Sequence, residues 1–458
     1  MKLTLIHPCI GRIPGKNYIR SWQMEPLPMA YIAGMTPSDV EVNFFDDRME
    51  EIDYDNPTDL VALSVETYTA KRAYQIASEY RRRNIPVVMG GFHAVLVPEE
   101  VSEYAESVVI GEAESIWPEL IKDFKNGELK PIYKNKERPI LSNTIPDRRI
   151  FENKNYLKLG LVEVSRGCTF KCDFCAIQSV FNSTQNYRDI DTILSEIKEL
   201  KSTRKLFFFV DDNIVANPTR MKEFFRRLIP LKIRWVSQGT ITMARDDELL
   251  KLMVESGCQG LLIGFESLHS KNLASMNKSF NKVKGGIDAA IMKIHNYGLR
   301  IYATFVFGYE YDDKETIQKT IEFCKKHKIF MVAFNHLTPF PGTPLYKKLK
   351  AENKLLYDKW WLDDKYKYGQ VPFKTNLEPE WITDSCVKAR KSFYSYSSII
   401  SRAFTKSTFN SLKMTKTYFF INYLLRREAS ERENYPLGDD TYTNQILKVK
   451  PQGILVND

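Results

Sequence analysis

Short apolar runs, separated by polar segments with helical spacing, recur through the first 125 residues. Five of these runs are rich in Val, Ile, Leu and Phe, end at Pro, Gly or Asp, and have the length of buried strands. Residues 70–83, between two of them, carry apolar residues at helical spacing. This alternation predicts an α/β domain with a parallel sheet. The expected strands are residues 2–8, 40–46, 59–65, 86–91 and 107–112.

Small and polar residues follow several of these strands. Ligands of open parallel sheets bind at the carboxyl ends of the strands, where glycine lets the backbone come close to a bulky molecule. We therefore expect a planar or phosphorylated ligand at this edge. The candidate binding residues are Ser64, Thr67, Gly90, Gly91, Gly111 and Glu112.

A second series of strand-like runs follows a segment rich in Lys, Asn and Pro, residues 126–149, which predicts a linker. Beyond it, six strand-like runs alternate with helical segments; the runs are residues 161–165, 205–212, 233–241, 260–267, 300–308 and 331–339. Six such units predict a partial (β/α)6 barrel, whose chemistry gathers at the carboxyl ends of its strands. We expect a parallel-sheet domain (1–135), a linker (136–155), the partial barrel (156–345) and a mostly helical C-terminal region (346–458).

Three of the seven cysteines lie within eight positions, directly after the first barrel strand, in Ser165-Arg-Gly-Cys168-Thr-Phe-Lys-Cys172-Asp-Phe-Cys175. Three thiolates at this spacing can hold three corners of an iron–sulfur cube and leave one iron open. Structural zinc is an alternative, but it takes four Cys or His ligands and no His is near this loop in sequence. A second alternative is that these are three unrelated buried cysteines that bind no metal. Isolated cysteines are expected in packing roles, namely Cys9, Cys258, Cys324 and Cys386.

Composition and charge add limits. Hydrophobic residues make up 43% of the chain and charged residues 27%, as in soluble globular proteins. The opening residues lack the apolar stretch of a secretory signal, and the best apolar run, 418–425, is far shorter than a membrane span, so we expect a cytoplasmic protein. The formal net charge is +9, and residues 388–427 are locally basic. A solvated surface is the usual explanation; an anionic substrate or a peripheral contact with a membrane surface is the alternative.

The cysteine motif and the β/α pattern around it resemble the radical S-adenosylmethionine (SAM) superfamily over residues 161–344. The resemblance implies that Cys168, Cys172 and Cys175 hold a four-iron four-sulfur (4Fe-4S) cluster. It also implies reductive cleavage of SAM to a 5'-deoxyadenosyl radical that removes hydrogen from an unactivated carbon. Such a reaction needs an electron donor such as flavodoxin or ferredoxin.

The same resemblance assigns SAM contacts. Phe174 would lie against the adenine, and Asp211 and Asp212 would end the strand that binds the amino group, where the superfamily often has Gly-Gly-Glu. The ribose and carboxylate contacts would be Ser237 and Gln238. The segment Gly260-Leu-Leu-Ile-Gly264-Phe-Glu266 resembles the superfamily's adenine strand. Glu266 could otherwise be an ordinary carboxylate at a strand end.

Residues 59–67, 87–93 and 109–112 resemble the Rossmann-like cobalamin-binding domain of radical SAM C-methyltransferases, such as the hopanoid methylases, and of the anaerobic magnesium-protoporphyrin monomethyl ester cyclase type. His93 joins the candidate residues on this basis, either as a pocket contact or as a surface turn residue. The D-x-H-x-x-G sequence that supplies a lower axial histidine is absent. The alternative is a domain that keeps the fold without the cofactor, because fold alone does not fix function.

The resemblance implies cobalamin-dependent C-methylation of a lipid, tetrapyrrole or natural product. A radical cyclase or oxidoreductase of the same architecture is the main alternative. A methylthio-transferring enzyme would carry a cysteine trio in its first domain, and a nucleic-acid-binding module would carry a recognisable motif; neither is present, so no nucleic acid partner is expected. In the C-terminal region, aromatic residues would form core or line an apolar substrate pocket, core being the more common role; they are Trp360, Trp361, Tyr366, Phe393, Tyr394 and Tyr396.

Overall fold

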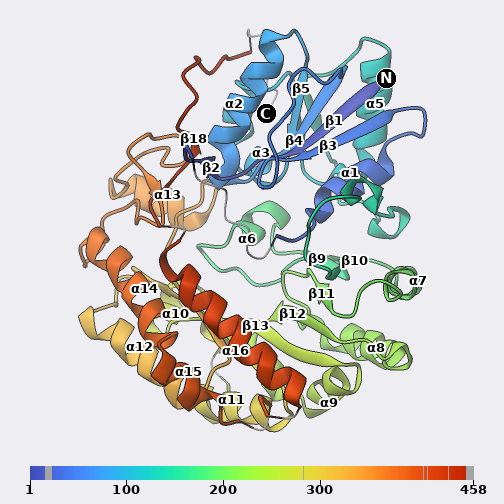
Figure 1. Ribbon diagram of the computed structural model, residues 1–458. Helices are drawn as coiled ribbons and strands as arrows, with labels where there is room; N and C mark the ends of the chain where they lie inside the picture. The colour runs from blue at the N-terminus through green and yellow to red at the C-terminus, as the bar shows by residue number, and fades with distance from the viewer. Residues whose placement is uncertain (16–22, 282, 406, 410, 432, 450–458) are drawn as a thin grey trace.

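The computed structural model describes residues 1–15, 23–281, 283–405, 407–409, 411–431 and 433–449. It shows two α/β bodies, each built on a six-stranded sheet. The first body contains the N-terminal third of the chain and lies at the top of Figure 1, and the second lies below it. None of the described helices is long and apolar enough to cross a membrane.

The first sheet is parallel throughout. All five expected strands are present. A sixth, β7, is made of three residues inside the segment expected to be a linker, where the high Lys and Pro content masks so short a strand. In the order β3-β1-β4-β5-β6-β7, the strands are β3 (Glu41–Asp46), β1 (Lys2–His7), β4 (Leu60–Ser64), β5 (Val87–Gly90), β6 (Ser107–Ile110) and β7 (Ile132–Lys134).

Helices cover both faces of this sheet, so its strands are buried on both sides, as in doubly wound sheets. On one face, α1 (Leu27–Met35) and α5 (Trp117–Lys125) pack against Leu3 and Leu5 of β1. On the other, α2 (Ala70–Arg82) packs against Val61 of β4.

The second sheet is the expected partial barrel, and its strands are parallel throughout. All six expected strands are present, in the order β15-β14-β13-β12-β11-β8. They are β8 (Gly160–Val162), β11 (Phe207–Phe209), β12 (Trp235–Gly239), β13 (Cys258–Glu266), β14 (Arg300–Phe307) and β15 (Met331–His336). The helices between them are α6 (Ala176–Phe181), α7 (Ile190–Leu200), α8 (Pro218–Leu228), α9 (Asp247–Glu255), α10 (Ser270–Ser275), α11 (Gly286–Asn296) and α12 (Lys314–Lys326).

Side-chain caps fix where several of these helices begin. The Asp189 carboxylate accepts a hydrogen bond from the Thr192 amide at the start of α7. Asp313 and Thr316 form a reciprocal capping box at the start of α12. Each cap satisfies backbone N–H groups that have no partner inside the helix, so the loops between strands and helices have defined ends.

The C-terminal region is mostly helical and then returns to the first body. It contains α13 (Pro344–Ala351), α14 (Pro379–Phe393), α15 (Tyr396–Ala403) and α16 (Leu412–Arg427). After α16, β17 (Tyr435–Pro436) pairs with β16 (Lys367–Tyr368), and β18 (Gly438–Asp439) pairs with β2 (Gly11–Arg12) of the first body. The chain therefore ties the two bodies together at its end.

The aromatic residues of this region are mainly core. Trp360, Trp361 and Tyr366 are fully buried with α2 of the first body, and Phe393 and Tyr394 lie in the barrel core. The prediction of core packing is confirmed for these five. It is wrong for Tyr396, whose side chain is exposed because it lies on the outer face of α15.

The carboxyl edges of the two sheets face each other. After β5, α3 (Phe92–Leu96) contacts α6, which follows the cysteine loop, and the Phe92 and Phe181 rings meet edge to face at 5.8 Å. Figure 1 shows α6 between the two bodies. The remaining short elements are α4 (Pro98–Ser102), β9 (Ser165–Gly167), β10 (Gln185–Tyr187) and the 3-10 helices η1 (Thr67–Thr69), η2 (Ala113–Ser115), η3 (Leu141–Asn143), η4 (Arg148–Phe151), η5 (Ile229–Leu231), η6 (Ile241–Arg245), η7 (Ser279–Asn281) and η8 (Glu428–Ser430).

Candidate functional site

The three cysteines lie on the loop between β9 and α6, at the carboxyl edge of the barrel. Cys172 is buried, and Cys168 and Cys175 are half-buried. Burial raises the pKa of Cys172 to about 12, and Cys168 and Cys175 are close enough to influence it electrostatically. Three neighbouring thiols shielded from water fit the donor set of an iron–sulfur cluster.

A single zinc ion fits this arrangement less well. Among the described residues, no three His, Cys, Asp or Glu side chains are grouped closely enough to hold one metal ion. A cube spreads its ligands over several irons, so its three thiolates need not converge on one point.

Two aspartates hold the cysteine loop in place. Asp211 is fully buried and accepts hydrogen bonds from the Val164 amide (3.2 Å) and from the Ser165 hydroxyl. Asp212 accepts one from the Gly167 amide (2.7 Å). Burial raises the pKa of Asp211 to about 8 and that of Asp212 to about 6. The loop thus engages the Asp211 carboxylate, and the expected contact of Asp211 with SAM stays a prediction.

The loop has a third anchor at its centre. The Tyr309 hydroxyl, after β14, donates to the Asp173 carboxylate at 2.8 Å. The Asp173 carbonyl accepts from the Leu345 amide (3.0 Å), and the Asp173 amide donates to the Met276 carbonyl (3.2 Å). Residues from three other segments of the chain thus fix the position of the cysteines.

A buried ion pair lies beside the cysteines. The Lys278 ammonium is 2.6 Å from Glu266 Oε1, and both side chains are more than nine-tenths buried. Lys278 also lowers the pKa of Cys172 and Cys175 electrostatically, though burial outweighs it at both thiols. A Cβ at Gly264 would meet Glu266 Oε1 at 2.2 Å, so glycine there leaves room for the pair. Glu266 itself adopts a left-handed backbone conformation, with φ of 62°.

The other expected SAM contacts differ in burial: Gln238 and Phe174 are half-buried, whereas Ser237 is buried. The Ser237 hydroxyl is buried and donates to the Phe209 carbonyl at 2.6 Å, and its expected contact with SAM stays a prediction. Gln238, the next residue, is half-buried on the opposite face of β12. Phe174 is half-buried, with its ring 6.4 Å from that of Tyr309 and 6.0 Å from the Lys278 ammonium.

Sequence reasoning missed two polar residues at this site. Lys278 lies in a loop after α10, and no periodic pattern singles it out. The Asn213 amide nitrogen is 3.8 Å from Cys168 Sγ, and its oxygen has no hydrogen-bond partner among the described residues. Its place directly after Asp212 at a strand end was the available signal.

In the first body, the candidate residues lie at the carboxyl edge of the sheet as expected. Ser64 ends β4, Gly90 ends β5, and Gly111 follows β6. Gly91 has φ of 95°, and a Cβ there would come within 2.7 Å of the Val65 carbonyl oxygen. The chain therefore turns tightly at Gly91, as close packing of β5 on the next loop requires.

His93 is fully buried, so the surface-turn alternative is wrong, and its contact with a ligand stays a prediction. Its ring is fully buried, with Nδ1 3.2 Å from the Thr67 hydroxyl and Nε2 3.1 Å from Glu100. The same Glu100 accepts from Trp361 Nε1 (2.8 Å) and pairs with Lys359 (3.0 Å). Both ring nitrogens of His93 and the Thr67 hydroxyl are therefore engaged within this network.

Glu112 also serves the contact between the two bodies. Its carboxylate accepts from Arg138 (2.7 Å) and Arg166 (3.2 Å), and Arg166 also pairs with Glu114 and Glu163. Arg166 belongs to β9, directly before the cysteine loop. Glu112 thus links the first body to that loop, and its expected contact with a ligand stays a prediction.

The strand order of the first sheet reverses between β1 and β4, which is where ligands of such sheets bind. His7 ends β1, and its buried Nδ1 has no hydrogen-bond partner among the described residues. Burial lowers the pKa of His7 to about 4. Glu66, just after β4, is exposed, yet the protein around it desolvates the carboxyl and raises its pKa. The buried, unpartnered imidazole nitrogen of His7 at this position indicates a ligand site.

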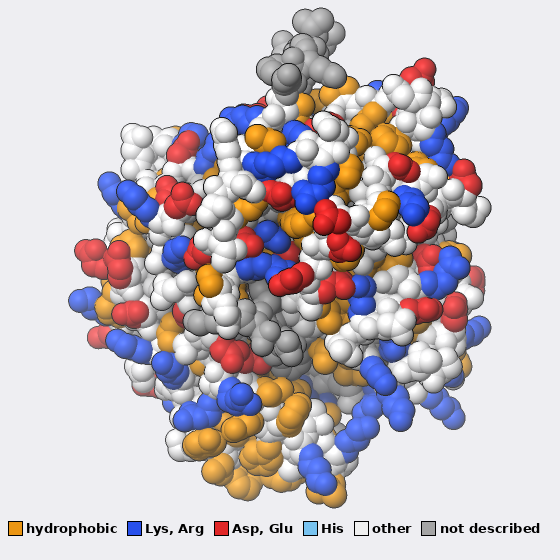
Figure 2. Space-filling view, turned by 45° about the horizontal axis from the view of Figure 1, so that its top comes forward, with side chains coloured by type: hydrophobic (Ala, Val, Ile, Leu, Met, Phe, Trp, Pro, Cys, Tyr) orange, Lys and Arg blue, Asp and Glu red, His pale blue; other side chains and the backbone are white. Residues whose placement is uncertain are grey.

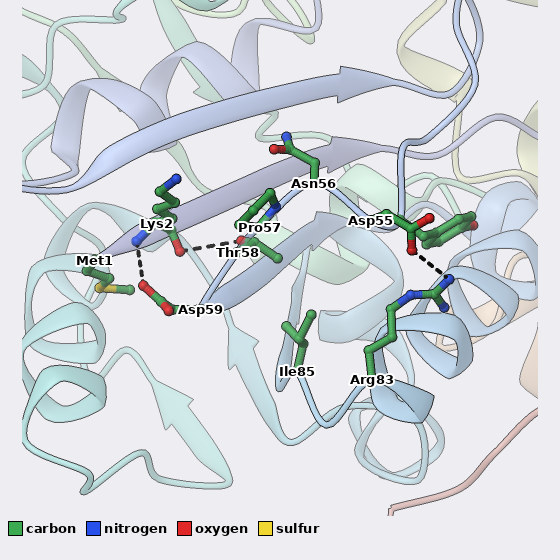
Figure 3. A pocket seen from close by; sticks show the side chains of 10 residues that line it. Met1, Lys2, Asp55, Asn56, Pro57, Thr58, Asp59, Arg83 and Ile85 are labelled. Atoms are coloured by element: carbon green, nitrogen blue, oxygen red, sulfur yellow. Dashed lines mark hydrogen bonds and ion pairs between the residues drawn. The ribbon is translucent and has the colours of Figure 1, made fainter.

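A hollow at the opposite edge of this sheet carries no comparable chemistry. Figure 3 shows it at the amino ends of β1, β4 and β5. Its polar groups pair with one another: the Lys2 amide donates to Asp59 (2.7 Å), and Arg83 lies 3.4 Å from Asp55.

Comparisons with known proteins agree with this geometry. The model of the radical SAM superfamily matches residues 162–324. The chain is 30% identical to bacteriochlorophyllide d C-12(1)-methyltransferase from Chlorobaculum tepidum, over 88% of each chain. It is 24% identical to the anaerobic magnesium-protoporphyrin IX monomethyl ester cyclase of Cereibacter sphaeroides, over 77% of this chain and 64% of that one.

A solved structure shares the two-body fold. The radical SAM methyltransferase TsrM from Kitasatospora setae, with cobalamin and a 4Fe-4S cluster bound, superposes with a TM-score of 0.60 and 17% identity, covering 77% of this chain and 78% of that one. The expected family and fold class are thereby confirmed. With Cys168, Cys172 and Cys175 grouped at the mouth of a partial barrel, this chain is a member of the radical SAM superfamily and a homologue of the bacteriochlorophyllide methyltransferases.

Proposed function

We propose that this radical SAM enzyme is a cobalamin-dependent C-methyltransferase acting on an apolar tetrapyrrole-like substrate. The observation that carries the proposal is the facing of two carboxyl edges: the ligand edge of the first sheet, with His7 and Glu66, and the barrel edge that holds the cysteine loop. The likeness to a bacteriochlorophyllide methyltransferase over 88% of both chains supports the reaction and the substrate class.

The chain would hold the cluster through Cys168, Cys172 and Cys175. Reductive cleavage of SAM at such a cluster supplies a 5'-deoxyadenosyl radical, with the electron coming from a donor such as flavodoxin or ferredoxin. The loop anchors Asp211, Asp212 and Tyr309 keep the three thiols in place. The enclosed site excludes water from the reacting groups.

We assign the binding of SAM to side chains on the inner face of the barrel. Gln238 and Phe174 are half-buried there, and Gly264 on the neighbouring strand leaves room for the Glu266–Lys278 pair. The Lys278 ammonium would face the SAM carboxylate, with Glu266 holding it in position. Ser237 and Asp211 would support this site through the backbone rather than touch SAM.

Cobalamin would lie between the bodies, at the carboxyl edge of the first sheet. Ser64, Gly90, Gly91 and Gly111 are the small residues there that permit close backbone approach. His7 and Glu66 are the polar groups at the switch point. Thr67, His93 and Glu112 would act indirectly, by fixing this edge against the barrel and the C-terminal region.

An apolar substrate fits the lining of the barrel. Val236, Leu262 and Val306 are half-buried on alternate positions of β12, β13 and β14, while their neighbours pack into the helical layer. This lining favours a large planar or lipid-like molecule over a charged one. We expect no nucleic acid partner and a cytoplasmic location, with the peripheral membrane contact argued below.

The test is anaerobic reconstitution with iron, sulfide and hydroxocobalamin, followed by incubation with reductant, bacteriochlorophyllide d and SAM carrying a deuterated methyl group. We expect bound cobalt, 5'-deoxyadenosine and a tetrapyrrole with one added deuterated methyl. The matched control is Cys168→Ala, Cys172→Ala, Cys175→Ala, which should form no product. Cobalt binding without any methylated tetrapyrrole would overturn the substrate class, and no cobalt would overturn the cofactor.

A radical cyclase is the second candidate, supported by the likeness to the anaerobic cyclase over 77% of this chain. With magnesium-protoporphyrin monomethyl ester as the substrate, a cyclase would form a product that has a new ring and no deuterated methyl group. Mass spectrometry of the same incubations with that substrate separates the two reactions.

A further inference from the structure

We propose that α15, α16 and the loop between them form a docking surface for the anionic face of a lipid bilayer. This helical surface, residues 396–405, 407–409 and 411–427, carries eight of the large exposed hydrophobic side chains of the described chain. They are Tyr396, Ile400, Phe404, Phe409, Leu412, Phe419, Phe420 and Tyr423. The site involves neither the cysteines nor the cobalamin edge, so it stands apart from the proposed reaction.

The apolar stripe of α16 faces outward. A surface helix normally turns its apolar face to the core. Of the 16 residues of α16, only Tyr418 and Asn422 are buried, whereas Leu412 is 73% exposed and Phe420 is 62% exposed. In Figure 1, α16 lies across the front of the lower body. Figure 2 shows hydrophobic side chains gathered at the lower edge of the molecule with Lys and Arg side chains beside them.

Charge decides which occupant fits. From residue 385 to residue 427 the sequence contains nine Lys and Arg and no Asp or Glu. Two of the nine do not add free surface charge, because Arg402 is buried and Arg390 pairs with Glu433. Lys413 and Lys416 are exposed on α16 beside the aromatic stripe, and Arg427 ends the helix. Aromatic and aliphatic side chains flanked by basic ones are the pattern of a helix that lies in the interface of an anionic membrane.

The surface is held rigid from behind. The buried Arg402 donates to the Asn422 side chain (3.0 Å) and to the Phe393 carbonyl (3.1 Å), which joins α15 to α16 and both to α14. On the outside, the Arg426 guanidinium lies 4.3 Å from the Tyr396 ring centroid. Because the fold depends on these buried contacts, the outward side chains can be replaced without unfolding the helices.

A membrane contact would bring the enzyme to apolar molecules that partition into lipid. The insertion of aromatic side chains supplies the apolar part of the binding, and the lysines supply the attraction to anionic headgroups. Binding should therefore depend on both, and it should weaken with added salt.

The experiment is co-sedimentation of the cluster-loaded full chain with vesicles of phosphatidylcholine alone or with phosphatidylglycerol. We expect the wild type to bind the mixed vesicles, and Phe420→Ser with Tyr423→Ser to lower the partition coefficient about tenfold or more. Lys413→Glu with Lys416→Glu should abolish the preference for phosphatidylglycerol. Reductive SAM cleavage in solution shows that each variant still folds.

The matched controls remove the same chemistry elsewhere. Ile140→Ser with Ile145→Ser removes exposed apolar area, and Lys134→Glu with Lys136→Glu reverses exposed charge, both in or near the first body. These variants should bind vesicles like the wild type. The proposal is overturned if the wild type ignores phosphatidylglycerol, or if the docking variants and controls bind alike. It is also overturned if light scattering shows a dimer of the wild type that the Phe420 variant loses while neither sediments with vesicles.

Discussion

The Lys278 ammonium and the Glu266 carboxylate are 2.6 Å apart in a buried position beside the cysteine loop. Taking two charges out of water is costly, and their attraction offsets that cost only while both are present. The pair is therefore strongly coupled, and Gly264 leaves the space in which it forms.

Breaking this pair should destabilise the protein more than removing it. Lys278→Met leaves the Glu266 carboxylate buried and unpaired, and we expect the free energy of unfolding to fall by about 3 kcal/mol. Lys278→Met with Glu266→Gln should cost less than the sum of the two single changes. Urea denaturation of the four proteins measures the coupling. Lys271→Met, an exposed lysine on α10, is the control and should change little.

The same variants test the assignment of SAM binding. Lys278→Met should raise the KM for SAM about tenfold or more, whereas Lys271→Met should not. Unchanged KM and kcat in Lys278→Met would show that the ammonium only stabilises the fold.

The Asp211 carboxyl should be needed for its shape and hydrogen bonds rather than for charge. Burial raises its pKa to about 8, so the group is largely protonated at neutral pH. Asp211→Asn keeps an acceptor for the Val164 amide and should retain the cluster, while Asp211→Ala should lose iron about tenfold faster to a chelator. The exposed Asp384→Ala is the control. Equal loss from both Asp211 variants would contradict this role.

Glu100 joins the first body to the C-terminal region through His93, Trp361 and Lys359. Although burial opposes it, hydrogen bonds from His93 and Trp361 lower the pKa of Glu100 to about 2. A carboxyl with a lowered folded-state pKa stabilises the protein above its unfolded pKa of about 4.3, and the stabilisation is lost as pH falls towards 2.

Glu100→Gln should therefore lower the free energy of unfolding by about 2 kcal/mol at pH 7. The difference from wild type should shrink as the pH falls below about 4.3. The exposed neighbour Glu99→Gln serves as the control. A difference that stays constant down to pH 3 would show that the charge of Glu100 contributes nothing.

His7 should make the protein less stable in mild acid. Its pKa is lowered from the ordinary 6.5 to about 4 by burial, so between these values the unfolded chain takes up a proton that the folded one does not. The free energy of unfolding should fall as pH drops through this window, by up to about 1.4 kcal/mol per pH unit from this group. His7→Asn should have a flatter profile. A profile as steep as that of the wild type would contradict the shielded position of His7.

Apolar runs and thiol spacing were strong signals in the sequence. Eleven of the twelve strands in the two six-stranded sheets followed from runs of Val, Ile, Leu and Phe, and the three cysteines from their spacing. The exception, β7, is three residues long, too short for such a run to show.

The sequence could not decide which side of a strand faces the ligand. Ser237 and Gln238 are neighbours on strand β12. Because both faces of this strand are covered, the hydrophobicity of its residues does not show which of them face the barrel interior and which face the helices. The structure places the Ser237 hydroxyl on the Phe209 carbonyl instead. Asp211 likewise has the chemistry of a ligand contact but holds the loop.

Contacts between residues far apart in sequence could not be predicted either. The role of His93 depends on Glu100, which is shared with Trp361 from a region 261 residues away. The role of Lys278 becomes apparent only in the fold, which places its ammonium beside Glu266 and the cysteines. The orphaned nitrogen of His7 becomes visible only once the strand order places β1 beside β4.

The most direct test of the account is iron counting and 5'-deoxyadenosine formation after anaerobic reconstitution. The wild type should hold about four irons per chain and cleave SAM when reduced, as a 4Fe-4S cluster requires. The triple variant Cys168→Ala, Cys172→Ala, Cys175→Ala should hold no cluster and form no 5'-deoxyadenosine. The double variant Cys258→Ala with Cys324→Ala changes only buried packing cysteines, so it should keep both the cluster and SAM cleavage. Iron and SAM cleavage that persist in the first variant would contradict the assignment of these three cysteines.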